Sequence, residues 1–215
     1  MLFLTSCLHV DQHHTQTCDP TRLYACEGVE VHNVRLIFHV PSIIEKTELD
    51  LAGIHEYVAH AQEFFYNSNI VFFDVEVVHD MPPYKLAYNT SFESMDVFYR
   101  ITRVDPRGIH IFVVDGIHDV ERPELTIVGL QHSRFTNSCK NVIFLTNGIS
   151  KQTFVHELGH YFGLNHVVDV NNIMHRGLLS RAHDAKFRKN QYKRMNTYAK
   201  FVVDYCVRDE NYHVK

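Results

Sequence analysis

One stretch, from His156 to His166, holds the side chains best suited to chemistry, and it reads H-E-L-G-H-Y-F-G-L-N-H. His156 and His160 are four residues apart, so on a helix their imidazoles project from one face about one turn apart. Two nitrogens held in this way suit a zinc ion, which binds imidazole nitrogen at about 2.0–2.1 Å. Glu157 follows the first histidine, so its carboxylate would lie beside the metal and could accept a proton from an activated water.

The rest of the stretch predicts how a third ligand returns to the metal. Gly163 comes three residues after His160, where a helix that ends in a left-handed residue has its glycine. The chain can then turn sharply and bring His166 back as the third ligand. A fourth position would stay open for water, as in catalytic zinc sites. The alternative is an amphipathic core helix with surface histidines, which requires this whole spacing to arise by chance among 17 histidines in 215 residues.

The stretch resembles the extended zinc motif of the metzincin metallopeptidases, H-E-x-x-H-x-x-G-x-x-H. In that family the motif is followed downstream by a methionine in a tight turn. Met174, eight residues after His166 in the run Asn171–His175, is the candidate for that turn. Within the metzincins, the motif looks most like the pappalysin type and other compact bacterial members. Many metzincins have a tyrosine two residues after the methionine, where this chain has Arg176, although others such as the matrixins work without it.

The resemblance implies a metzincin, or zincin-like, fold of the α+β class. Such a fold has a twisted mixed sheet, two long helices above an active-site cleft, and a small C-terminal subdomain with the methionine turn and a helix. Residues 8–28 are polar and weakly patterned, so residues 1–28 are expected to form an N-terminal segment. The resemblance implies a catalytic domain over 29–215, with an upper subdomain of about 29–165 and a lower one of about 166–215. It also implies one zinc ion per chain and a zinc-dependent endopeptidase that cuts proteins or peptides, with Glu157 as general base.

In metzincins the strand before the last one forms the upper edge of the cleft, and here this strand corresponds to residues 127–133. An edge strand offers unpaired N–H and C=O groups with which an extended peptide can pair. The alternative is an ordinary edge strand protected by polar neighbours. His175, next to the methionine, could polarise a carbonyl, bind a product carboxylate or simply pack. The candidate cleft residues are therefore Ile127, Val128, Gly129, Leu130 and His175.

Two other functions remain open for the same zinc helix. The first is a zinc-holding binding or adhesion module that has lost turnover. The intact Glu157 argues against it because binding alone does not need a base, whereas Arg176 in place of the tyrosine keeps it open. The second is a different zinc hydrolase, such as an amidase, which would lack a peptide-length cleft along residues 127–133.

The composition is that of an ordinary globular protein, with 45% hydrophobic and 21% charged residues. The net charge of −4 with neutral histidines implies no basic face for nucleic acid. No apolar run approaches the roughly 20 residues that a membrane span needs. The expected partner is a protein or peptide substrate, and the chain is expected to be a monomer.

The first seven residues, M-L-F-L-T-S-C, resemble the end of a bacterial lipoprotein signal, in which small residues precede the lipidated cysteine. Lipid on Cys7 would anchor the protein to a membrane. No positive charge precedes this segment and its apolar part is short, so a plain hydrophobic N-terminus is the alternative.

The chain has five cysteines. If Cys7 carries lipid, the four that remain permit two disulfides in an exported protein, with three possible connectivities. The local pair would be Cys18 with Cys26, which leaves Cys139 with Cys206. Free thiols in a reducing cytoplasm are the alternative. The protein is expected outside the cytoplasm, either secreted or as a lipoprotein.

Apolar runs and alternation predict the strands, which are Val34–Val40, Val71–Val78, Ile109–Val114, Thr126–Leu130 and Val142–Leu145. A capping box at Thr47–Asp50 and apolar residues at helical spacing predict a helix that ends near Tyr66. Ser150 is expected to cap the N-terminus of the zinc helix. A last helix is expected from about Phe187 to Cys206.

Overall fold

The computed structural model describes residues 30–41, 51–81, 85–88, 98, 108–119, 126–133, 141–176 and 184–202. Several sequence predictions lie outside these residues. They are the lipid anchor at Cys7, the capping box at residues 47–50, and the disulfides among Cys18, Cys26, Cys139 and Cys206. These features, and the location outside the cytoplasm that follows from the first of them, stay predictions.

The main sheet has five strands in the order β2–β1–β4–β8–β7. Four of them run parallel, namely β1 (His32–Pro41), β2 (Ile70–Met81), β4 (Ile109–Val114) and β8 (Asn141–Thr146). The fifth strand, β7 (Gly129–Ser133), is antiparallel to β8 and lies at the edge. Every residue of β4 and of β8 is buried, as is typical of central strands covered on both faces.

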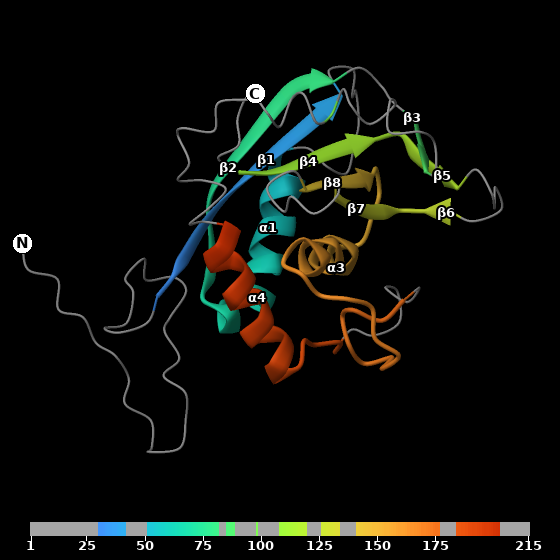
Figure 1. The fold of residues 1–215 in the computed structure, drawn as a ribbon. Coiled ribbons are helices and arrows are strands. Elements are labelled where there is room, and N and C mark those ends of the chain that lie inside the picture. Colours follow the sequence, from blue (N-terminus) through green and yellow to red (C-terminus); the bar gives the residue numbers. More distant parts are fainter. Residues whose placement is uncertain are drawn as a thin grey trace, which may run out of the picture.

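A second sheet has three strands in the order β3–β5–β6. β3 (Lys85–Tyr88) is parallel to β5 (Gly116–Asp119), and β6 (Thr126–Ile127) is antiparallel to β5. β5 follows β4 after one residue, and β7 follows β6 after one residue, so the two sheets are continuous along the chain. Figure 1 shows the three short strands beyond the ends of β4 and β7.

The segment predicted as one strand, 126–130, is divided at Val128 between the two sheets. The carbonyl of Val128 still accepts hydrogen bonds from the backbone N–H and the hydroxyl of Thr146, at 3.0 and 3.1 Å. The other predicted strands are confirmed, with β1, β2 and β8 longer at both ends. The structure confirms a fold that combines helices with a mixed sheet, although four of the five strands of the main sheet are parallel. The cleft, the methionine turn and the division into two subdomains stay predictions.

Two helices, α1 (Leu51–Phe65) and α3 (Lys151–Tyr161), pack on one face of the main sheet (Figure 1). A short 3-10 helix, η1 (Tyr66–Ser68), follows α1 directly, and the C-terminal helix α4 (Lys189–Phe201) packs against it. Of the chain between α3 and α4, the described residues 162–176 and 184–188 lie on the side of α3 that faces away from the sheet (Figure 1). None of the described helices is long and apolar enough to cross a membrane.

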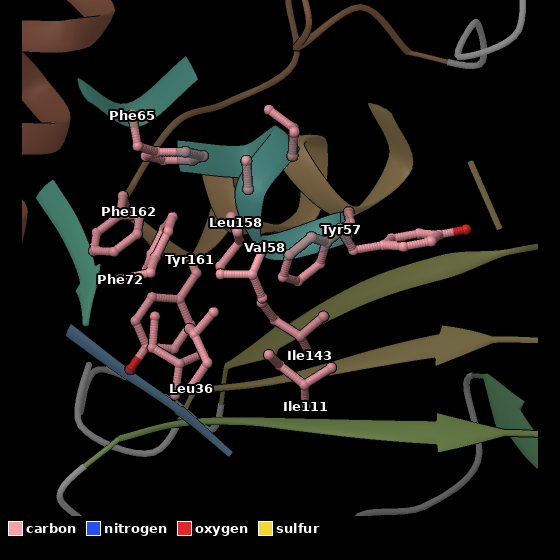
Figure 2. Packing of buried hydrophobic residues seen from close by; sticks show 14 of the residues in the cluster. Leu36, Tyr57, Val58, Phe65, Phe72, Ile111, Ile143, Leu158, Tyr161 and Phe162 are labelled. Atoms are coloured by element: carbon pink, nitrogen blue, oxygen red, sulfur yellow. The ribbon is translucent and has the colours of Figure 1, made fainter. Parts of the chain in front are cut away.

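The largest core lies between the sheet and these helices. Figure 2 shows Leu36, Ile111 and Ile143 from three neighbouring strands directed toward Val58 of α1 and Leu158 of α3. All five side chains are buried. Burial of each such side chain contributes about 1.5–3 kcal/mol. This packing fixes α3 on the sheet and so fixes the place of its two histidines.

Candidate metal centre

The helix that carries the first two histidines begins as predicted. Ser150 has extended backbone angles, φ −77° and ψ 153°, and its side chain accepts a hydrogen bond from the backbone N–H of Thr153 at 3.2 Å. A serine in this role satisfies one of the N–H groups that the first turn of a helix leaves without a partner. The position of α3 along the chain is thus set locally.

The end of α3 has the geometry that returns the chain toward the helix. Gly163 has φ +82°, and its N–H donates to the carbonyl of His160 at 2.9 Å. The N–H of Leu164 donates to the carbonyl of Gly159, also at 2.9 Å. This pair of bonds is the Schellman motif, in which a left-handed glycine ends the helix. A β-carbon on Gly163 would also lie 3.1 Å from the ring of Tyr198.

After this reversal the side chain of His166 meets those of His156 and His160. The three Nε2 atoms lie 3.0 Å (156–160), 3.1 Å (160–166) and 3.2 Å (156–166) apart. A tetrahedral zinc ion with Zn–N bonds of 2.0–2.1 Å would hold such nitrogens about 3.3–3.4 Å apart. The three nitrogens therefore need to separate by only a few tenths of an ångström to hold an ion, and among the described residues this is the one such His, Cys, Asp or Glu cluster.

Two of the imidazoles are oriented by backbone carbonyls. His156 Nδ1 lies 2.7 Å from the carbonyl oxygen of Ile173, and His160 Nδ1 lies 2.8 Å from that of Leu164. Because a carbonyl oxygen can only accept, each Nδ1 must carry the hydrogen, and each Nε2 is left with its lone pair for a metal. The tautomer that a metal requires is thus already set in both rings.

The surroundings also favour the neutral form of the rings. Burial lowers the pKa of His156 to about 4. Burial is likewise the main cause that lowers the pKa of His160 and of His166, and for His166 the nearby Arg176 adds to it. A neutral imidazole is the form that binds a metal, so the cluster is in its binding form near neutral pH.

Glu157 is buried, and its side chain is directed to the edge strand β7. Its Oε2 accepts a hydrogen bond from the backbone N–H of Gln131 at 2.7 Å. Burial raises the pKa of Glu157 to about 8, although the bond from Gln131 acts in the opposite direction. A β-carbon on Gly129 would lie 2.9 Å from Glu157 Cγ and 3.0 Å from Oε1, so only glycine leaves room for the carboxylate here.

The predicted cleft residues of the segment 127–130 lie in three different environments. Ile127 and Leu130 pack against a second buried cluster around Phe98 and Phe144, so their side chains contribute to the hydrophobic core. Gly129 lies against Glu157 and Thr153 of α3. Its neighbour Gln131 was not singled out in the sequence, although the alternation of a strand places it beside Gly129. Val128 lies between β6 and β7. Its side chain is exposed, and its carbonyl accepts a hydrogen bond from the hydroxyl of Thr146.

The outward edge of β7 can be read from its hydrogen bonds. Val128 bonds to Thr146 of β8, whereas the N–H of Gln131 is directed to Glu157 and so points away from β8. In an antiparallel pair, alternate residues direct their backbone groups to the partner strand and to the opposite side. The backbone groups of Gly129 and Gln131 therefore face outward.

Met174 packs against α3 at Gly159. It is fully buried, and its Sδ lies only 2.5 Å from where a β-carbon on Gly159 would be. Gly159 stands between His156 and His160 in the helix, and sequence reasoning missed its role. The available signal was a glycine inside a helix, which costs about 1 kcal/mol relative to alanine and so calls for a packing reason.

The turn that carries Met174 returns to the segment after His166. The N–H of Val167 donates to the carbonyl of Met174 at 2.9 Å, and the N–H of His175 donates to the carbonyl of Asn172 at 2.9 Å. The side chain of His175 is half-buried, and its Nδ1 is buried with no hydrogen-bond partner among the residues that the structure describes. The charge of His175 also contributes, after burial, to the lowered pKa of His156 and of His166.

Comparison with known proteins shows which solved structures share the fold of this chain. No protein-family model matches the chain, and no curated protein sequence matches it. Metalloproteinase-II from Bacteroides fragilis is similar in structure, with a TM-score of 0.56 at 14% identity over 79% of this chain. This chain spans 54%, about half, of that protein. A zinc-dependent peptidase from Methanocorpusculum labreanum has a TM-score of 0.50 at 12% identity, over 75% of this chain and 100% of its own. The chain thus shares the fold of these two metallopeptidases.

Proposed function

We propose that the protein is a zinc-dependent endopeptidase that hydrolyses peptide bonds in proteins or peptides. One zinc ion would be held by His156, His160 and His166. The single observation that carries the proposal is the three Nε2 atoms at 3.0–3.2 Å, with two rings already in the metal-binding tautomer. The names of the two structural relatives, a metalloproteinase and a zinc-dependent peptidase, support it.

Glu157 is proposed as the general base. Zinc, when bound, polarises a carbonyl and lowers the pKa of a water molecule. The N–H of Gln131 holds Oε2 of Glu157, so Oε1 is the oxygen that would accept a proton from the attacking water. The same carboxylic acid would then pass the proton to the leaving amine. The buried position of Glu157 keeps bulk water from competing for this proton.

The edge strand β7 is proposed to bind the substrate backbone. The outward groups of Gly129 and the carbonyl of Gln131 can pair with an extended peptide, as an added strand pairs with a sheet edge. Since Gln131 N–H already binds Glu157, the pairing would place the peptide next to the general base. An added strand of this kind favours peptides over small esters.

Met174 is proposed as the methionine of the turn that supports the zinc ligands. It would act as an apolar floor without binding the metal, because its sulfur packs against Gly159, between the two histidines of α3. The carbonyl of Ile173, the residue before it, orients His156. The turn thus supports the first ligand by packing and by a hydrogen bond.

The test is Glu157→Gln beside the wild-type protein. Glutamine keeps an oxygen that can accept the N–H of Gln131 but cannot act as a base. We expect unchanged zinc content and a loss of about 10²–10⁴-fold in the cleavage of a mixed peptide library. The matched control is Glu63→Gln, which changes an exposed glutamate of α1 and should have no effect.

Two outcomes would contradict the proposal. Cleavage by Glu157→Gln within a few-fold of wild type would remove Glu157 as the base. A wild-type protein that binds zinc tightly but cuts no peptide would favour the binding-module alternative. Zinc content, melting temperature and cleavage rate from one preparation separate these cases.

A further inference from the structure

A buried pair of side-chain amides joins the turn below the metal cluster to the C-terminal helix. Asn172 Nδ2 donates to Gln191 Oε1 at 2.8 Å, and Gln191 Nε2 lies 3.3 Å from Asn172 Oδ1. Only 3% of Asn172 and 7% of Gln191 are exposed, so both amides are shielded from water. Because each amide both donates and accepts, the pair fixes the relative orientation of the two side chains.

Each amide has a second bond that ties it to its own segment. Asn172 Oδ1 also accepts the backbone N–H of Met174 at 2.9 Å, which closes the turn around Ile173. Gln191 Oε1 also accepts the backbone N–H of Arg188 at 2.7 Å, within the capping box that begins α4. The pair therefore connects the tight turn at 172–174 with the first turn of α4.

The residue enclosed by this turn is the one that orients the first histidine. The carbonyl of Ile173 accepts the Nδ1–H of His156 at 2.7 Å. The residue before Ile173, Asn172, bears the side-chain oxygen, and the residue after it, Met174, donates its backbone N–H to that oxygen. A rotation of the Asn172 amide would release the N–H of Met174 and change the direction of the Ile173 carbonyl.

We propose that Asn172 and Gln191 are positioning residues for the metal centre, through which α4 fixes the Ile173 carbonyl and hence the tautomer and orientation of His156. The inference rests on the proposed zinc site. The pair is not needed to hold α4 in place, since Met195 and Ala199 of the same helix are fully buried in the main core. The pair instead fixes the direction of the Ile173 carbonyl, which accepts the hydrogen bond from His156.

Two substitutions break the pair in different ways. Gln191→Met keeps the length of the side chain and removes both bonds to Asn172. In Asn172→Ser the hydroxyl can still accept the N–H of Met174 but is too short to reach Gln191, so the turn is kept and the pair is lost. The matched control is Asn196→Ala, which removes another amide of α4, the one that donates to the carbonyl of Ser68 at 2.9 Å.

The readouts are zinc affinity by chelator competition, the visible spectrum of the Co²⁺-substituted full-length protein, and melting temperature. Loss of an outer hydrogen bond of this kind typically weakens metal affinity about 10–100-fold. We expect that loss, and altered Co²⁺ bands, in Gln191→Met and in Asn172→Ser. The double variant should lose about as much as either single one, because both remove the same interaction. Asn196→Ala should lower only the melting temperature.

The inference is overturned if the wild type binds zinc and both variants keep its affinity and its Co²⁺ spectrum. If Gln191→Met does not fold, because it also loses part of the cap of α4, Asn172→Ser alone decides. Equal changes in the control variant would assign the effect to general destabilisation and would overturn the inference as well. A wild-type protein that binds no zinc would overturn the proposed function, and this inference with it.

Discussion

The carboxylate of Glu157 on α3 accepts the backbone N–H of Gln131 on β7 at 2.7 Å, across 26 residues of sequence. The glutamate beside the imidazole cluster is thereby anchored to the outward edge of the sheet. Since the same edge is the proposed binding site for the substrate backbone, the base and the peptide would share one strand. Changes in β7 should therefore alter catalysis without altering metal binding.

Gly129→Ala tests this coupling. The added methyl would lie 2.9 Å from Glu157 Cγ and 2.9 Å from Thr153 Cγ2, so the carboxylate must shift. A displacement of about 1 Å at a catalytic group can cost about 10²-fold in rate. We expect the turnover number to fall by at least about 10-fold with zinc content unchanged. The measurement is peptide cleavage beside metal analysis.

The control is Gly116→Ala in β5, where the added methyl would meet, among the described residues, only the His118 ring, at 3.4 Å or more. It should leave cleavage within about two-fold of wild type, because Gly116 is only half-buried and the added methyl meets the His118 ring at ordinary contact distance. If Gly129→Ala cleaved as fast as Gly116→Ala, the placement of Glu157 against β7 would not matter for catalysis.

Gly159→Ala should destabilise the protein even though alanine normally favours a helix. The helix preference is worth about 1 kcal/mol in its favour. The added methyl, however, would lie 2.5 Å from Met174 Sδ, and overpacking of this kind typically costs about 1–3 kcal/mol. We expect a net loss of stability in urea unfolding, together with weaker zinc binding.

The origin of that loss can be tested in the Met174→Ala background. Once the methionine side chain is gone, the same Gly159→Ala change should be neutral or stabilising, because only the helix preference remains. The sign of the effect would then differ between the two backgrounds. An equal loss in both would show that the contact with Met174 is not the cause.

The local parts of the site follow from the sequence because short-range geometry governs them. The spacing of His156 and His160 on one helix face, the Ser150 cap and the left-handed Gly163 each depend on residues within one or two turns. All three features are present as expected. The return of His166 follows from the same turn.

The long-range parts do not follow from the sequence. Gln131 with Glu157, Gly159 with Met174, and Asn172 with Gln191 are contacts between separate elements, and no periodicity specifies them. They depend on how the elements pack, which is fixed only by the complete fold.

In the edge strand, the sequence also does not show which side chains face the core and which face outward. A slip of one residue exchanges the two faces of a strand. The sequence groups Ile127 and Leu130 with Gly129 because any residue of an edge strand can offer its backbone groups, and it does not show that the side chains of Ile127 and Leu130 pack against the second core. The break at Val128, which passes the chain from one sheet to the other, has no marker in its residue type.

His166→Ala should weaken zinc binding sharply, because three protein ligands are the usual number in a catalytic zinc site. His166 is exposed, so the loss of its side chain should change the melting temperature of the metal-free protein little. The control is His55→Ala, an exposed histidine of α1. Unchanged zinc content in His166→Ala beside an unchanged control would require a different third ligand.

The metal-free protein should show a pH dependence of stability that belongs to Glu157. Burial raises the pKa of Glu157 to about 8 in the folded state, whereas an unperturbed glutamate titrates near about 4.3. Between these values the folded state holds a proton that the unfolded state has released. Stability must therefore fall as the pH rises through this window, by at most about 1.4 kcal/mol per pH unit. The low pKa of His156 acts in the opposite direction, between about pH 4 and 6.5.

Comparison with Glu157→Gln isolates the glutamate, because the histidines titrate in both proteins and glutamine cannot ionise. We expect the unfolding free energy of the variant, minus that of wild type, to increase from pH 5 to pH 8 and then to level off. Urea unfolding in the presence of a chelator at several pH values measures this difference. Added zinc should reduce the increase, since a bound cation favours the ionised carboxylate. A difference that stayed constant across the range would mean that Glu157 titrates as an ordinary exposed acid, which would contradict the raised pKa of its buried carboxyl.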